Sequence, residues 1–213
     1  MECVAFISQK GGSAKTTSLI SVSVAAARME RAGVLILDTD IAQGSALAWR
    51  GRRNAPWPVV EACRLADVDR RLRRARDEGF DLVFVDTAGR DDPALTGLIA
   101  CSDFVAVPCR PTVLDRDAIA PNVWSCRRAG VAFGVLLTCV KANTEARVQQ
   151  IRDYHRRSGG CVLDAQLSDR VRYQSAIASG LSVSEMSGDP ELADEPKVAW
   201  RAIRRRLAQT AGA

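Results

Sequence analysis

The stretch Ile7–Ser18, "ISQKGGSAKTTS", overlaps the end of an apolar run at residues 3–8 and has the composition of a phosphate-binding loop. In such loops glycines let backbone N–H groups surround the phosphates, a lysine neutralises charge, and a Ser or Thr hydroxyl at the start of a helix ligates Mg²⁺. The glycine pair of the stretch, followed by Lys15 and Thr16, fits this order. The stretch therefore predicts a strand, a phosphate loop and a helix in succession.

The loop departs from the usual G-x-x-x-x-G-K-[ST] pattern, which requires glycine at positions 9 and 14. The chain has Gln9 and Ala14 there, and Lys10 is an additional lysine. If position 14 needs a positive φ, alanine costs about 1 kcal/mol or more, whereas at a negative φ it fits with little penalty. A glycine–serine turn that leads into a helix would give a similar stretch, so the loop alone leaves two interpretations open.

Apolar, β-branched runs alternate with helical patterns along the whole chain. Several runs are almost continuously apolar, which is typical of parallel strands that are buried on both faces. We expect strands at residues 3–8, 33–39, 58–62, 80–87, 103–109, 131–140 and 161–167, and helices at residues 15–31, 44–53, 66–78, 92–101, 115–128, 144–157, 170–179 and 191–209. This alternation predicts a three-layer α/β fold, in which helices cover both faces of a mostly parallel, twisted sheet.

The composition is that of an ordinary globular chain. Of its 213 residues 47% are hydrophobic and 26% are charged, and we expect one domain over residues 1–213. No apolar run approaches the ~20 residues that span a bilayer, and the N-terminus has no signal-peptide pattern, so we expect a cytoplasmic protein. Seven scattered cysteines and one histidine form no zinc-binding pattern, which indicates reduced thiols in the core.

Acidic residues end two of the expected strands. "LILDTD" (residues 35–40) ends with Asp38 and Asp40, and "LVFVDTAG" (residues 82–89) carries Asp86. In parallel α/β sheets, ligands bind beyond the carboxyl ends of the strands. One such aspartate is often a turn or helix-capping residue, but two such strands beside a phosphate loop predict a nucleotide site with Asp86 near Mg²⁺.

Together these motifs resemble those of the deviant Walker P-loop ATPases of the ParA/MinD family. K-G-G-x-x-K-T-T, D-x-D followed by Q-x-S, and D-T-A-G carry the resemblance. "PCRPTVLD" (residues 108–115) is similar to the family's P-x-x-P-S-x-x-D segment near the adenine, and "SDRVRYQSAIASGLSVSE" (residues 168–185) is similar to a segment of short plasmid-partition ATPases. The resemblance is closest to the small, ParF-like branch, which has no N-terminal DNA-binding extension.

The resemblance implies roles for individual residues in a site for ATP and Mg²⁺. Lys10 would reach across an ATP-bound homodimer to the phosphates of the other subunit, and Asp40 would orient or activate the attacking water. Thr16 would ligate Mg²⁺, and Asp38 and Asp86 would support the metal or its water shell. The implied ATP-binding set is Lys10, Gly11, Gly12, Ser13, Ala14, Lys15, Thr16, Thr17, Pro111 and Asp115.

The segment after the second expected strand departs from the family's D-x-D-P-Q pattern. Ile41 and Ala42 stand in place of one proline, and this insertion moves Gln43 relative to Asp40. The spacing between Asp38 and Asp40 is kept. We therefore expect hydrolysis to be retained and slow, with the contact of Gln43 left open.

The basic residues of the chain, whose net charge is +5, are clustered, and one cluster lies in the last expected helix. Within residues 195–210, Trp200, Ile203 and Leu207 form one stripe with arginines around the rest. Membrane-binding helices have a broader apolar face, so we expect this stripe to dock on the sheet. A solvated basic surface is one interpretation. The resemblance favours DNA, and its candidate contacts are Arg170, Arg172, Arg201, Arg204 and Arg205.

The resemblance implies a dimerising ATPase that binds DNA nonspecifically when ATP is bound. It would partition plasmid or chromosomal DNA at the nucleoid, with a ParB- or ParG-like adaptor protein. Positioning of a protein assembly, such as a chemosensory cluster or a microcompartment, and an accessory role in conjugation are alternatives within the family. A small-molecule ligase on the same fold, against which Lys10 argues, and a nucleotide-binding scaffold without hydrolysis are alternatives from other classes.

Overall fold

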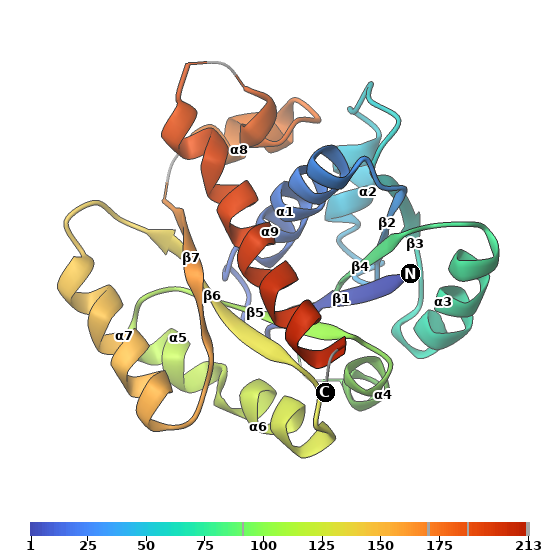
Figure 1. Cartoon of the computed structure of the whole chain (residues 1–213). Coiled ribbons are helices and arrows are strands. Elements are labelled where there is room, and N and C mark those ends of the chain that lie inside the picture. The colour runs from blue at the N-terminus through green and yellow to red at the C-terminus, as the bar shows by residue number, and fades with distance from the viewer. Residues whose placement is uncertain (91, 170, 187, 212–213) are drawn as a thin grey trace.

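The structure is a computed structural model that describes residues 1–90, 92–169, 171–186 and 188–211 (Figure 1). Its centre is a seven-stranded sheet in the order β3-β2-β4-β1-β5-β6-β7. The strands are β1 (Glu2–Phe6), β2 (Val34–Asp38), β3 (Val59–Ala62), β4 (Leu82–Asp86), β5 (Phe104–Cys109), β6 (Phe133–Val140) and β7 (Val162–Ser168). Every pair in this sheet is parallel. The expected α/β fold is confirmed.

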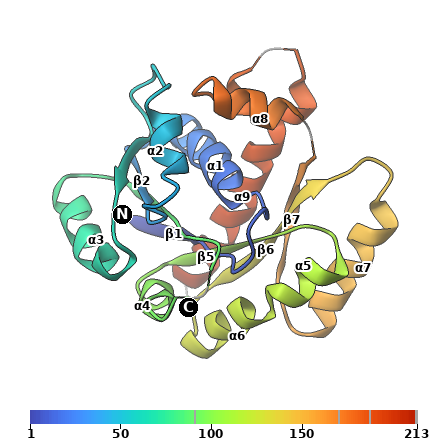
Figure 2. The same ribbon diagram turned by 180° about the vertical axis from the view of Figure 1, so that it is seen from behind.

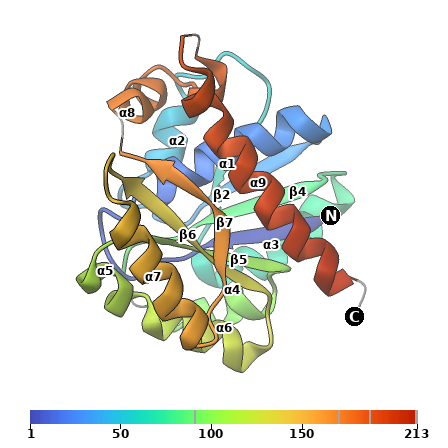
Figure 3. The same cartoon turned by 60° about the vertical axis from the view of Figure 1, so that its left-hand side comes forward.

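Helices cover both faces of the sheet (Figures 1 and 3). One face carries α1 (Lys15–Glu30), α2 (Ser45–Arg50), α8 (Val171–Ala178), the short 3₁₀ turn η2 (Val183–Glu185) and α9 (Pro190–Ala211). The other face carries the 3₁₀ turn η1 (Leu65–Asp67), α3 (Val68–Asp77), α4 (Leu95–Ala100), α5 (Val113–Ala118), α6 (Ala120–Ala129) and α7 (Glu145–Arg157), several of which come forward in Figure 2.

Two apolar cores lie on the two faces of the sheet, because successive side chains of a strand point to opposite faces. In β1, Val4 and Phe6 belong to one core, while Cys3 and Ala5 belong to the other. All four side chains are at most 2% exposed, which explains the nearly continuous apolar runs. The stripe of α9 docks on the first core as expected: Trp200, Ile203 and Leu207 are buried there.

The expected helix at residues 115–128 is two helices, α5 and α6. Pro121 stands at the start of α6 and has no N–H to donate to the preceding turn, so one continuous helix is interrupted near Ile119. Thr112 begins α5 by accepting a hydrogen bond from the N–H of Asp115 (3.1 Å). The helix therefore starts earlier than expected, and the side chain of Asp115 lies in its first turn.

The register of the central strands brings three strand ends together. Phe6 at the end of β1 and Asp38 at the end of β2 are both paired with Asp86 at the end of β4. Because all three strands are parallel, the loops that follow them leave the sheet at the same edge. This register places the loop at residues 7–14 beside Asp86, with Asp38 one strand further along the sheet.

Candidate nucleotide site

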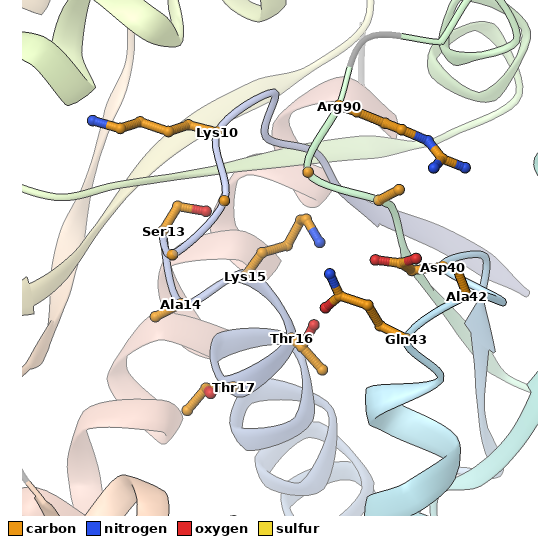
Figure 4. Close-up of a pocket in the computed structure, with 14 residues that line it drawn as sticks. Lys10, Ser13, Ala14, Lys15, Thr16, Thr17, Asp40, Ala42, Gln43 and Arg90 are labelled. Carbon is orange, nitrogen blue, oxygen red and sulfur yellow. The ribbon is translucent and has the colours of Figure 1, made fainter.

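A pocket of about 420 Å³ opens at this edge of the sheet (Figure 4). Three segments line it: the loop between β1 and α1, the turn after β2, and the loop after β4. Its lining residues are Lys10, Gly11, Gly12, Ser13, Ala14, Lys15, Thr16, Thr17, Asp40, Ala42, Gln43, Ala88, Gly89 and Arg90. The stretch that resembles a phosphate loop thus forms the wall of a real cavity.

The backbone of the loop takes left-handed conformations at two positions. Gly12 has φ +76°, and Ala14, immediately before α1, has φ 57° and ψ 28°. Position 14 therefore does adopt a positive φ, and alanine there costs about 1 kcal/mol relative to glycine. The loop is held by a hydrogen bond from Thr138 Oγ1 on β6 to the carbonyl of Ser13 (2.9 Å), and the carbonyl of Ala14 accepts the N–H of Ser18 (2.8 Å).

Lys15, Thr16 and Asp86 form a cluster at the floor of the pocket. The hydroxyl of Thr16 donates to Asp86 Oδ2 (2.6 Å), and Lys15 Nζ lies 3.2 Å from Asp86 Oδ1. Asp86 is 1% exposed. Burial raises the pKa of its carboxyl, and the charge of Lys15 and the hydrogen bond from Thr16 oppose that rise. A second cation near this carboxylate would be electrostatically favourable.

Oxygen donors of this kind suit Mg²⁺, which binds through one or two protein oxygens together with phosphates and water. The hydroxyl of Thr16 and the carboxylate of Asp86 are adjacent, and Asp40 lines the same pocket. Among the described residues no group of three His, Cys, Asp or Glu side chains could hold a metal ion by itself. The site therefore fits a metal that arrives with the phosphates better than a resident metal.

Asp38 is held by hydrogen bonds from the backbone after β2. Its carboxylate accepts hydrogen bonds from the backbone N–H groups of Ala46 (3.0 Å) and Leu47 (3.2 Å) at the start of α2, and from that of Asp40 (3.1 Å). Asp38 is fully buried, and this burial raises the pKa of its carboxyl despite the three donors. It connects the end of β2 to α2 and does not line the pocket, so its support of a metal stays a prediction.

The insertion at Ile41 and Ala42 forms a tight turn. The carbonyl of Asp40 accepts the N–H groups of Gln43 (3.0 Å) and Gly44 (2.7 Å), and the side chain of Ile41 is 55% exposed. The turn carries Gln43 into the pocket, where its side chain lies close to Thr16, opposite the phosphate loop (Figure 4). The insertion therefore changes the path of the chain but leaves Gln43 facing the site.

Lys10 lines the pocket, but its side chain points away from the pocket's centre. Its Nζ lies 2.9 Å from Asp115 Oδ1, and in Figure 4 it extends away from Lys15 and Asp40. Asp115 is 4% exposed and also accepts from the hydroxyl of Thr112. Pro111 is buried as well, and neither it nor Asp115 lines the phosphate pocket. Their predicted contact with ATP therefore stays a prediction, whereas Asp115 clearly contacts Lys10.

Arg90 is a lining residue that the sequence reasoning missed. It follows Gly89, whose backbone packs so closely on the loop that an added Cβ would lie 3.3 Å from the Cα and N of Gly11. This contact fixes Arg90 at the rim, on the side of Asp40 (Figure 4). The only sequence signal was its place immediately after the D-T-A-G motif.

Residues 1–123 match a protein-family model described as VirC1 protein. The chain belongs to the VirC1 family. Over 208 residues it is also 29% identical to the "Maintenance of carboxysome distribution protein A" of Gloeobacter kilaueensis, an alignment that covers 96% of this chain and 93% of that protein.

Solved structures show the fold of this VirC1-family chain to be that of ParA/MinD-type P-loop ATPases. The cell division ATPase MinD of Pyrococcus furiosus has a TM-score of 0.79 at 14% identity, covering 96% of this chain and 98% of that chain. A variant of Cyanothece McdA in complex with ATP has a TM-score of 0.75 at 15% identity, covering 98% and 96%. A putative plasmid partition protein of Borrelia burgdorferi bound to AMPPNP has 0.70 at 15%, covering 98% and 99%. The resemblance seen in the motifs is confirmed.

The arginines predicted to contact DNA do not form one free patch. Arg204 pairs with Glu2 and Glu30 and lies over the ring of Trp200, so it ties α9 to β1 and α1. Arg201 lies 3.6 Å from an oxygen of Asp194, and Arg205 lies 3.8 Å from one of Asp164; both arginine side chains are more than half exposed. Arg172 is half-buried, and Arg170 lies outside the described residues.

Within the described part of the chain, no helix combines the length and the apolar character needed to cross a membrane.

Proposed function

We propose that this VirC1-family chain is an ATPase that binds ATP with Mg²⁺, dimerises around the nucleotide and, as a dimer, binds DNA nonspecifically to position a cargo. The observation that carries the proposal is the cluster of Lys15, Thr16 and Asp86 under a loop of backbone N–H groups, with Asp40 on the opposite side of the same pocket. The ATP, AMPPNP and Mg-ADP in structures of the same fold support the choice of ligand.

In this proposal each residue of the pocket has a distinct task. The backbone of residues 11–16 surrounds the β-phosphate at the N-terminus of α1, where the helix dipole favours anions. Lys15 exchanges its contact with Asp86 for phosphate oxygens, and Thr16 and Asp86 hold Mg²⁺ or its water shell. Held there, Mg²⁺ would supply positive charge that offsets the negative charge of the phosphates.

Hydrolysis needs a positioned water molecule and a compensating charge. Asp40 and Gln43 face the end of the pocket where the terminal phosphate would lie, so they would orient the attacking water. Lys10 of each subunit would leave Asp115 and bind the terminal phosphate of the opposite nucleotide, as the family resemblance implies. Turnover would be slow in the free chain, because Lys10 is held by its own subunit.

The proposed DNA contact lies at the opposite edge of the sheet, where α7 ends and β7 begins. A cavity of about 430 Å³ there is lined by Arg152, Arg156 and Arg206, and no carboxylate belongs to its described lining. Arg156 pairs with Asp153 (2.7 Å), yet its side chain is 73% exposed, and Arg205, which precedes Arg206 in α9, is 64% exposed. Exposed arginines around a concave surface suit phosphodiesters, so these residues replace Arg204 as the favoured contacts.

ATP would control DNA binding through dimerisation. One weakly basic surface gives weak, salt-sensitive binding, but two surfaces on one dimer bind the same DNA with a high effective concentration. A DNA-binding adaptor would stimulate hydrolysis and release the dimer. The carboxysome-distribution relative favours positioning of a protein assembly as a second candidate task; partition of DNA remains the first.

Retention on DNA with ATP, ADP or no nucleotide, measured as salt is raised, tests this proposal. We expect retention with ATP alone, and a double substitution Arg156→Ala/Arg205→Ala should reduce the salt dependence by about two counterions per subunit. The matched control is Arg73→Ala/Arg76→Ala on the exposed side of α3. Retention that is the same in all three nucleotide states would contradict the switch.

A further inference from the structure

Three cationic side chains surround the nucleotide pocket, and they differ in their partners. Lys15 contacts Asp86 at 3.2 Å, and Lys10 contacts Asp115 at 2.9 Å. Arg90 lines the pocket, is exposed, and has no ion pair or hydrogen bond within the described residues. Arg90 is therefore the pocket cation that can bind an anionic ligand without first breaking a bond inside the protein.

The backbone that carries Arg90 is fixed from three sides. The hydroxyl of Thr87 donates to the carbonyl of Phe6 (2.9 Å), and the N–H of Thr39 donates to the carbonyl of Asp86 (2.9 Å). Gly89 packs on the backbone of the phosphate loop itself. These contacts join the loop after β4 to the ends of β1 and β2. The backbone next to Arg90 is therefore fixed, while its side chain can bind a ligand.

The position of Arg90 matches the place where negative charge would accumulate. In Figure 4 its guanidinium lies on the Asp40 side of the pocket, across from the phosphate loop. A terminal phosphate held over Lys15 and Thr16 would approach the carboxylate of Asp40, and two negative charges so close repel each other. A guanidinium can donate two parallel hydrogen bonds to phosphate oxygens and stays charged at any physiological pH.

We propose that Arg90 binds the γ-phosphate of ATP within its own subunit and stabilises the charge that develops on that phosphate during hydrolysis. This inference rests on the proposed ATPase function and adds a residue to it. The oxygen of water forms a bond to the γ-phosphorus, the bond from that phosphorus to the β–γ bridging oxygen breaks, and ADP keeps that electron pair. The proton of the water passes to Asp40 or to a phosphate oxygen, and Arg90 keeps its own protons.

The proposal also makes Arg90 the residue that distinguishes ATP from ADP. Lys15, Thr16 and the loop N–H groups contact phosphates that both nucleotides have. Arg90 lies beyond them, at the rim. Its contact is gained only when a third phosphate is present, so ATP and not ADP would gain affinity from it.

Equilibrium binding of ATP and ADP and single-turnover hydrolysis, each with Mg²⁺, test the proposal on wild type, Arg90→Ala and Arg90→Lys. We expect Arg90→Ala to weaken ATP binding about tenfold, to leave ADP binding unchanged and to slow hydrolysis about 100-fold. Arg90→Lys should recover part of both losses because it keeps the charge but not the two-pronged geometry. Arg76→Ala, an exposed arginine of α3, is the matched control and should behave as wild type.

Thermal unfolding shows whether each variant is folded, and Arg90→Lys keeps the test valid if the alanine variant is not. If wild type hydrolyses ATP and both Arg90 variants match it in ATP affinity and rate, this inference is wrong and the proposed ATPase function stands. If ATP and ADP affinities fall equally, Arg90 acts through loop structure and the γ-phosphate assignment is wrong. A wild-type chain that binds neither nucleotide would overturn both proposals.

Discussion

Lys10 Nζ and Asp115 Oδ1 are 2.9 Å apart, so the additional lysine of the phosphate loop is bound to a carboxylate of its own subunit. Burial acts to raise the pKa of Asp115, but the hydrogen bonds from Thr112 and Lys10 and the charge of Arg110 together hold that pKa below its ordinary value. Asp115 is therefore charged in the folded chain. For Lys10 to reach another subunit, this ion pair has to break.

Substitution Asp115→Asn should therefore favour the dimer. The charge that holds Lys10 is removed while the size of the side chain is kept. Because Lys10 is 36% exposed, the pair contributes at most about 1 kcal/mol, which corresponds to an about fivefold lower ATP concentration at half-maximal dimerisation. Sedimentation velocity over an ATP titration measures this midpoint.

The control for that experiment is Asp117→Asn, on the exposed side of the same helix, which should leave the midpoint unchanged. An unchanged or higher midpoint in Asp115→Asn would show that the ion pair does not restrain Lys10.

Substitution Ala14→Gly should stabilise the chain, because the backbone there has φ 57°. Relief of the left-handed strain gains about 1 kcal/mol, and the larger entropy of the unfolded glycine chain offsets part of it. We expect Tm to rise by about 1–2 °C. Ala208→Gly, at an exposed position in the last turn of α9, is the control and should lower Tm, since glycine is a poorer helix former than alanine. A lower Tm for Ala14→Gly would disprove the strain.

Substitution Gly89→Ala should weaken nucleotide binding several-fold. Its Cβ would lie 3.3 Å from the backbone of Gly11, so the phosphate loop or the loop after β4 has to shift by a few tenths of an ångström. Isothermal titration with ADP and Mg²⁺ measures the change. Gly97→Ala on α4, where an added Cβ has nothing within 4 Å, is the control. Equal ADP affinity in both variants would mean that the contact is not needed.

The pair Arg53–Glu185 should make stability depend on pH. The two side chains form two hydrogen bonds, of 2.8 and 2.9 Å, and join the segment after α2 to η2. Burial acts to raise the pKa of Glu185, but Arg53, the N–H of Ser182 and Arg28 hold it below its ordinary 4.5. The stabilisation is therefore complete above about pH 4.5 and is lost as pH falls through the lowered pKa.

Urea unfolding of wild type and Glu185→Gln from pH 7 to pH 3.5 measures that contribution as a difference. We expect a loss of about 2 kcal/mol at pH 7 that shrinks toward the acid end. The raised pKa values of Asp38 and Asp86 act with the opposite sign and are common to both proteins, so they cancel. Glu191→Gln, on the exposed start of α9, is the control. A difference that does not change with pH would rule out the charge of Glu185 as its cause.

The sequence predicts those residues of the site that directly follow or end a strand. Lys15, Thr16 and Asp86 come together because β1 and β4 are neighbours and parallel, and apolar runs followed by polar residues indicate both strands. The pairing of Lys10 with Asp115 could not be predicted, since it depends on Thr112 capping α5 earlier than the helical pattern indicates, which places Asp115 in the first turn.

Surface arginines were the least predictable part. Arg204 and Arg205 are adjacent in sequence, yet one is bound to Glu2 and Glu30, and the other is largely exposed beside Asp164. A helical pattern predicts the face of the helix on which each side chain lies. It does not predict which acidic residues of other elements that side chain contacts. Arg90 was missed for a related reason: its position follows from the packing of Gly89 on the loop, which no local pattern records.

The most direct test of the whole account is the mass of the chain in solution with Mg²⁺ and ATP, with Mg²⁺ and ADP, and without nucleotide. Light scattering coupled to size exclusion should give twice the chain mass of 23.0 kDa with ATP and the single-chain mass in the other two conditions. Lys10→Ala should lose the ATP-bound dimer. The same mass in all three conditions, or a Lys10→Ala chain that dimerises and hydrolyses ATP as wild type does, would contradict the account.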